Sequence, residues 1–173
     1  MPQLADEYFA GTIVYLCEHN AEGAMGLVVN RPSEMTFGEL LEQLGLPVPG
    51  AVADRPVLEG GPVAPERGFI LHDDDDSRFE GSLEMGPGLM LSASQAALAA
   101  LADARGPRRW LVALGFAGWG PGQLEQEILE NVWLNCPVDP VVLFDTPFEA
   151  RVARAAAGLG IDFNLLSGHA GHA

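Results

Sequence analysis

A cysteine, a glutamate and a histidine follow one another near the start of the chain. Cys17, Glu18 and His19 are the residue types of an activated thiol, in which a histidine draws the proton from sulfur and an acid orients the imidazole. Apolar runs on either side, joined by a polar link from Asn20 to Gly23, predict a β-hairpin whose turn carries these residues. Side chains alternate along a strand, so Cys17 and His19 would share one face and Glu18 would point away. The pattern therefore allows a Cys–His pair, and it favours a buried, weakly reactive Cys17 with His19 hydrogen bonded in the turn.

Histidines and acids elsewhere raise the question of a metal. His169 and His172 are three residues apart, but a flexible tail over residues 167–173 would lose conformational entropy on coordinating an ion. The run from Asp73 to Asp76 lacks the spaced acids, the central glycine and the closing glutamate of an EF-hand. No HExxH or CxxC spacing occurs in the chain. We therefore expect no metal site.

A glycine-rich stretch, GWGPGQ, precedes a helical pattern and loosely resembles a phosphate-binding loop. The chain has neither GxxxxGK[ST] nor GxGxxG, and it contains no lysine. Gly118, Gly120 and Gly122 instead predict a tight turn from a strand into a helix, so no cofactor is expected. Glu125 and Glu127 follow two residues apart, face different directions on a helix and are expected to be solvated acids of its first turn rather than an acid–base pair.

Alternating short strands and helices must position these residues. Helix signals are a capping box formed by Thr36 and Glu39, a Ser92 cap before an alanine-rich run, the pattern after Gly122, and Thr146 before a helix that runs to about Gly158. Strand signals cover residues 56–59, 68–72, 81–85, 88–91, 110–116 and 141–144, with a further candidate at 161–166. The apolar runs 110–116 and 141–144 predict central strands. The pattern predicts an α+β fold with a mixed sheet, which could curl into an open barrel, and about four helices.

Composition limits the class of protein. The 173 residues, 48% hydrophobic and 19% charged, fit one domain over residues 1–173. The chain shows no membrane-span or signal pattern, and two distant cysteines predict free thiols in the cytosol. A net charge of −15, with nine arginines as the only strong bases, opposes direct binding to nucleic acid. The adjacent Arg108 and Arg109 are expected to be a solvated strand start.

Several motifs together resemble the AlgH/YqgE family of bacterial proteins. They are YLCEHNAEGAMGLVVNRP, LEGGPV, RGFILH, ALGFAGWGPGQLEQEILENVWL and SGHAGHA, and they extend over nearly the whole chain. The resemblance implies an α+β fold with a strongly coiled mixed sheet, and a further apolar strand before the motif that is MPQLAD here. It also implies a role in transcriptional regulation, while it transfers no catalytic or ligand-binding residue.

Polar and aromatic residues within these motifs form our candidate functional surface. Its members, which could line a shared groove, are Glu18, His19, Asn20, Asn30, Trp119, Gln123, Glu125, Asn131 and Trp133. We expect a cytosolic, non-enzymatic regulatory or interaction protein that binds one or more protein partners and affects transcription indirectly. The alternative is a small-molecule-binding enzyme or thiol-dependent sensor centred on Cys17 and His19. Direct DNA binding is a third interpretation, which the charge opposes.

Overall fold

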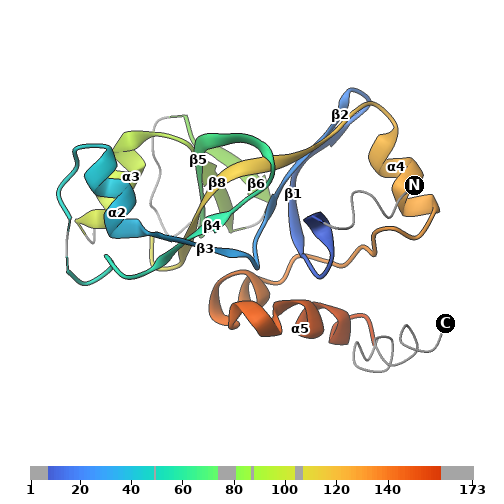
Figure 1. The fold of residues 1–173 in the computed structure, drawn as a ribbon. Helices are drawn as coiled ribbons and strands as arrows, with labels where there is room; N and C mark the ends of the chain where they lie inside the picture. Colours follow the sequence, from blue (N-terminus) through green and yellow to red (C-terminus); the bar gives the residue numbers. More distant parts are fainter. Residues whose placement is uncertain (1–7, 49, 74–80, 87, 104–106, 161–173) are drawn as a thin grey trace. The chain divides into compact units, whose positions relative to one another are not determined.

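The computed structural model describes residues 8–48, 50–73, 81–86, 88–103 and 107–160 (Figure 1). The chain divides into two compact units, unit 1 with Met1–Asn30 and Gly118–Ala173, and unit 2 with Arg31–Ala117. The described residues include the helices α2 to α5 and the strands β1 to β8, with both parallel and antiparallel pairs, which confirms the predicted α+β class. That the whole chain acts as one domain stays a prediction. The candidate strand at 161–166 and the tail at 167–173 lie outside the described residues.

Unit 1 begins with the predicted hairpin. Strand β1 (Val14–Asn20) pairs with β2 (Gly23–Val28) in antiparallel register, and the turn is the two-residue link after Asn20. The residues from Cys17 to Asn20 therefore lie in the strand, and their predicted place in the turn is wrong. The register shifts between Leu16 and Glu18, so Cys17 is the extra residue of a β-bulge. A bulge breaks strict alternation, which was the basis for placing Cys17 and His19 on one face.

The second half of unit 1 is helical. Helix α4 (Gln123–Leu129) follows the glycine-rich turn, and Gly122 adopts a left-handed φ of 75° before it. A π-helical turn, η1 (Val141–Asp145), leads through a 3-10 turn, η2 (Phe148–Ala150), into α5 (Arg151–Ala157). Helix α5 ends at Gly158, as the sequence predicts.

The strand predicted at residues 141–144 is wrong. Pro140 has φ −58°, which already suits a helix, and the Asp139 side chain accepts a hydrogen bond from the Val141 amide at 2.9 Å. The apolar run is buried as a helical turn through Val142 and Leu143. Thr146 also departs from its predicted role, because its hydroxyl donates to the Val141 carbonyl at 2.8 Å and closes η1 instead of capping α5.

The described part of unit 2 contains strands in the order β3-β4-β8-β5-β7-β6. Their bounds are β3 Pro32–Thr36, β4 Pro56–Glu59, β5 Val63–Asp73, β6 Leu83–Gly86, β7 Leu89–Ser92 and β8 Trp110–Trp119, of which the last two residues belong to unit 1. The β4–β8 pair is parallel and the other pairs are antiparallel, so the sheet is mixed, as predicted. Strand β8 lies between β4 and β5, which confirms the predicted central strand at 110–116.

Two helices pack together in unit 2. Helix α2 (Phe37–Gln43) begins with the predicted capping box of Thr36 and Glu39. Helix α3 (Gln95–Ala102) is capped by Ser94, whose hydroxyl accepts from the Ala97 amide, so the predicted Ser92 cap is wrong. The two helices lie side by side in Figure 1 and share one core cluster with β4, β5 and β8, which includes Phe37, Leu41, Val57, Ile70, Leu101, Trp110 and Val112.

Gly61 marks a close approach between two strands. A Cβ atom at this position would clash with the backbone of Phe116, and its φ is +158°. Gly61 lies between β4 and β5, and only a residue without a side chain lets this turn reach β8. No helix in the described part of the chain is both long and apolar enough to cross a bilayer.

Candidate functional site

A histidine–glutamate pair joins the hairpin of unit 1 to α4. His19 Nε2 on β1 donates to Glu125 Oε1 in the first turn of α4 at 2.7 Å, and both side chains are exposed. The hydrogen bond from His19, followed by one from the helix backbone, lowers the pKa of the Glu125 carboxyl. Carboxylates are favoured at a helix N-terminus, so the pair stabilises the contact between two elements that are far apart in sequence.

The Glu127 carboxylate connects two tryptophans. Its Oε1 accepts from the indole of Trp119 at 3.3 Å and from the indole of Trp133 at 3.0 Å. Its Oε2 accepts from Gln123 Nε2 at 3.0 Å, while Gln123 Oε1 accepts from the Gly120 amide at 2.9 Å. We call these four residues, Trp119, Gln123, Glu127 and Trp133, the Glu127 cluster. Because one carboxylate accepts three hydrogen bonds, it holds the end of β8, α4 and the chain after α4 in one arrangement.

Aromatic packing extends the Glu127 cluster. The Phe9 ring lies 6.4 Å from Trp119 and 5.5 Å from Trp133, and the two indoles are 5.8 Å apart, all between centroids. Trp119 is buried and Trp133 is partly exposed. These distances are typical of favourable aromatic pairs, so the three rings form a small apolar centre beneath the polar groups.

The other predicted surface residues have separate roles. Asn20 donates to Glu18 at 3.1 Å at the end of the hairpin, where both are exposed. Asn30 accepts from the Ile13 amide at 2.9 Å and donates to the Gly11 carbonyl at 2.8 Å, so it holds the chain that enters β1. Asn131 has φ 59° just after α4, a conformation that asparagine tolerates well. The structure thus brings together His19 with Glu125, and Trp119, Gln123 and Trp133 through Glu127, whereas the shared groove stays a prediction.

Cys17 is held away from nucleophilic chemistry. The thiol is partly buried, and burial raises its pKa to about 12, so the reactive thiolate is strongly disfavoured. Its Sγ lies 3.7 Å from the Tyr15 carbonyl, while the described partner of His19 is Glu125. Among the described residues, no cluster of three metal-binding side chains is found, and His169 and His172 lie outside the described ranges.

Sequence reasoning missed two polar arrangements. Glu127 was expected to be a solvated acid, and the four-residue spacing from Gln123 was the available signal that it has a partner. In unit 2, His72 Nε2 lies 2.9 Å from Ser92 Oγ, which lies 2.6 Å from Ser82 Oγ. His72 and Ser92 are fully buried and Ser82 is half-buried, so the histidine end of this chain of hydrogen bonds is closed to substrates. Polar residues at the ends of the apolar runs 68–72 and 89–92 were the only sign of it.

Exposed aliphatic side chains lie at the end of α4 and in the chain after it. In the 129–138 segment, Leu129 is 77% exposed, Leu134 is 65% exposed and Val138 is 57% exposed. Residues 118–150 contain no arginine, lysine or histidine, and their acids are Glu125, Glu127, Glu130, Asp139, Asp145 and Glu149. The segment therefore presents apolar groups within an acidic surrounding.

The fold and this surface define an α+β protein whose most elaborate polar arrangement surrounds α4. The family model described as AlgH-like matches residues 1–164. A UPF0301 protein of Stutzerimonas stutzeri strain A1501 is 51% identical over 175 residues, covering 100% of this chain and 92% of the relative. A UPF0301 protein of Xanthomonas campestris pv. campestris strain B100 is 49% identical over 174 residues with the same two shares.

Solved structures agree with the sequence comparison. The solution structure of the AlgH protein from Pseudomonas aeruginosa matches with a TM-score of 0.81 and 48% identity over 96% of this chain and 88% of that chain. Protein DIP2367 from Corynebacterium diphtheriae matches with a TM-score of 0.66 and 20% identity over 84% of this chain and 78% of that chain, a likeness of fold alone. The chain belongs to the AlgH-like family, which confirms the resemblance read from its motifs.

Proposed function

We propose that this protein is a non-enzymatic regulatory protein of the cytoplasm that binds a protein partner through α4 and the 129–138 segment. The observation that carries the proposal is the exposure of three large aliphatic side chains, Leu129, Leu134 and Val138, close together in sequence. Large exposed apolar patches are typical of binding sites, and these three side chains within ten residues supply the apolar groups for such a site. The hydrogen bond from the Trp133 indole to Glu127 fixes the middle of this segment against α4.

The charge around the segment selects the partner. Residues 118–150 carry six acids, named above, and no base, so a partner with apolar side chains flanked by arginine or lysine is complementary. The same charge repels nucleic acid. An effect on transcription would therefore pass through a bound protein rather than through DNA.

The alternative of a thiol-dependent enzyme or sensor receives less support. An activated cysteine needs a lowered pKa, whereas burial raises the pKa of Cys17 to about 12. His19, the base that would activate it, hydrogen bonds to Glu125.

The test compares two surface variants. Tagged wild-type protein and the Leu129→Ser/Leu134→Ser double variant are cross-linked in cells, and proteins lost only from the double variant are purified for titration calorimetry. Leu83→Ser, which removes a leucine that is 58% exposed in unit 2, is the matched control. We expect the double variant to weaken binding of the purified partner by about tenfold or more, which is about 1.4 kcal/mol, because it removes two apolar anchors at once.

Three results decide the proposal. Binding that weakens with salt and is unaffected by Leu83→Ser supports it. Equal affinity of the double variant and the wild type would contradict the assigned surface. A salt-dependent gel shift with mixed-sequence duplex DNA at micromolar protein would contradict the indirect route.

A further inference from the structure

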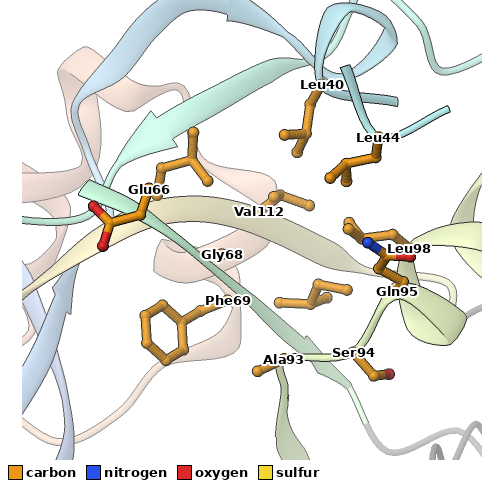
Figure 2. Close-up of a pocket in the computed structure, with 12 residues that line it drawn as sticks. Leu40, Leu44, Glu66, Gly68, Phe69, Ala93, Ser94, Gln95, Leu98 and Val112 are labelled. Atoms are coloured by element: carbon orange, nitrogen blue, oxygen red, sulfur yellow. The ribbon is translucent and has the colours of Figure 1, made fainter. Parts of the chain in front are cut away.

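A pocket opens in unit 2 between α2 and α3, above strands β5 and β8 (Figure 2). Its volume is about 140 Å³. Leu40 of α2 and Leu44, the C-cap of that helix, line one side and Leu98 of α3 lines another, as the close-up shows. Leu44 is 37% exposed, so this pocket leaves apolar surface in contact with water. The pocket lies wholly within unit 2 and is independent of the surface proposed above.

The pocket exists because a glycine stands where the sheet pattern calls for a side chain. On the face of the sheet that α2 and α3 cover, Ile70 pairs with Val112, and Gly68 pairs with Leu114. Ile70 and Val112 are buried and fill their part of the core. A Cβ atom built on Gly68 would meet only the Leu114 side chain at 3.6 Å, an ordinary contact. The missing side chain therefore leaves a vacant volume in an otherwise packed layer.

Polar groups at the pocket edge limit what could occupy it. Gln95 lies at the edge beside Leu98, with no hydrogen bond from its carboxamide in the described residues. The neighbouring Ser94 hydroxyl oxygen accepts from the Ala97 amide as the cap of α3. Glu66 lies at another edge, and the chain has a net charge of −15, so an anion would be repelled. The pocket thus offers apolar walls, one free amide and an unfavourable potential for acids.

We propose that this pocket binds a neutral, benzene-sized aromatic molecule that carries one hydrogen-bonding group, such as a phenol. An engineered cavity of about 150 Å³ with aliphatic and aromatic walls binds benzene, so the volume here suits a single ring. The ring lies on the flat backbone at Gly68 between Leu40 and Leu98. The hydroxyl of the ligand hydrogen bonds to the Gln95 carboxamide at the pocket edge, and the apolar ring atoms of the ligand stay inside.

Titration of the full-length protein with three probes tests the proposal. Phenol, toluene and benzoate have similar rings and differ in their polar group, and binding is followed by changes in amide chemical shifts. We expect phenol to bind with a Kd on the order of 1 mM, as suits a fragment, and benzoate to bind at least tenfold more weakly. The perturbed amides should include Gly68, Gln95 and Leu98.

Three variants locate the site. Gly68→Val fills the pocket above β5 with a side chain that strands favour, and it should weaken the binding of phenol and of toluene by tenfold or more. Gln95→Ala should weaken the binding of phenol by about threefold to tenfold, the contribution of one net hydrogen bond. The affinity for toluene should be unchanged. Gln43 lies at the end of α2 and does not line the pocket, so Gln43→Ala should change the affinity for neither phenol nor toluene.

Each outcome decides the proposal. No saturable shift with phenol or toluene overturns it, and so does undiminished binding in folded Gly68→Val. Benzoate affinity equal to that of phenol overturns the ligand class. If Gly68→Val does not fold, Ala93→Phe fills the pocket from its exposed edge, and binding of either ring that survives this change likewise overturns the assignment.

Discussion

The two units of the chain differ in the balance of apolar and polar contacts that stabilise them. Unit 2 has one apolar cluster in which α2, α3 and three strands bury residues such as Phe37, Ile70 and Val112. Unit 1 buries apolar groups too, but single polar side chains connect its elements, with Arg151 and Glu127 as the chief examples. Non-directional burial tolerates exchange of similar side chains, whereas a polar connection depends on particular atoms. The difference predicts which substitutions each unit will withstand.

A charge in the unit 2 core should have the largest effect. Val112 is 2% exposed at the centre of the sheet, and Val112→Asp places a carboxylate there without a partner. We expect a loss of about 4 kcal/mol or more in the free energy of unfolding, measured with urea. Leu83→Asp, at an exposed position on β6, should cost within about 0.5 kcal/mol. Equal costs for the two would mean that the core of unit 2 is misplaced.

Arg151 is the residue of unit 1 whose substitution should cost the most stability. Its guanidinium is buried and donates to the carbonyls of Thr146, at 2.8 Å, and of Val29, while it lies over the Phe148 ring. Burial lowers the pKa of Arg151 from an ordinary value so high that the group stays charged at neutral pH. Arg151→Ala leaves two carbonyls without their donor, and we expect a loss of about 3 kcal/mol by urea unfolding. Arg154→Ala, on the exposed side of α5, serves as the control, and similar losses in both would remove the special role of Arg151.

The sequence was most informative where one physical signal decides the structure. The capping box at Thr36, the apolar run of β8 and the hairpin link after Asn20 each rest on local chemistry, and each is found as predicted. The prediction of a strand from Val141 to Phe144 was wrong because four apolar residues fit a buried strand or a helical turn equally well. Its neighbours Asp139 and Pro140 supplied the missing signal.

The candidate site was less predictable because its contacts cross long sequence distances. His19 and Glu125 were both chosen, yet no periodicity joins residues 106 positions apart. Glu127 was set aside as solvated, since a sequence does not show that two indoles will converge on one carboxylate. The bulge at Cys17 was equally unpredictable from the sequence, because it depends on the register with the partner strand.

The two cysteines should differ sharply in reactivity. Cys136 is exposed, whereas burial raises the pKa of Cys17 to about 12. The thiolate is the reacting species, and after allowance for the greater nucleophilicity of a more basic thiolate we expect iodoacetamide at pH 7.5 to alkylate Cys136 on the order of a hundredfold faster. Mass spectrometry of timed digests gives both rates. Faster labelling of Cys17 would revive the thiol-dependent interpretation.

Glu127 allows a graded test of polar connection. Glu127→Ala removes the acceptor of both indoles and should cost about 1–2 kcal/mol by urea unfolding, whereas Glu127→Gln keeps one acceptor oxygen and should cost less. Tryptophan fluorescence should change for Glu127→Ala in the folded protein, because Trp119 and Trp133 lose their hydrogen bonds. Glu130→Gln alters the next acid along the chain, which is exposed, and is the control. Unchanged fluorescence together with unchanged stability would show that the aromatic packing alone holds the segment.

The smallest effect should come from the exposed pair of His19 and Glu125. The pair lowers the pKa of Glu125 in the folded protein, so the unfolded chain takes up this proton first as the pH falls. The stabilisation is therefore present above the ordinary carboxyl range and disappears as the pH falls through the lowered pKa. Glu125→Gln should shift the urea midpoint slightly at pH 7 and less at pH 3, and salt should reduce the shift at pH 7. A shift that is the same at both pH values would show that the two side chains contribute through shape rather than charge, which would leave the Glu127 cluster as the polar connection that fixes α4.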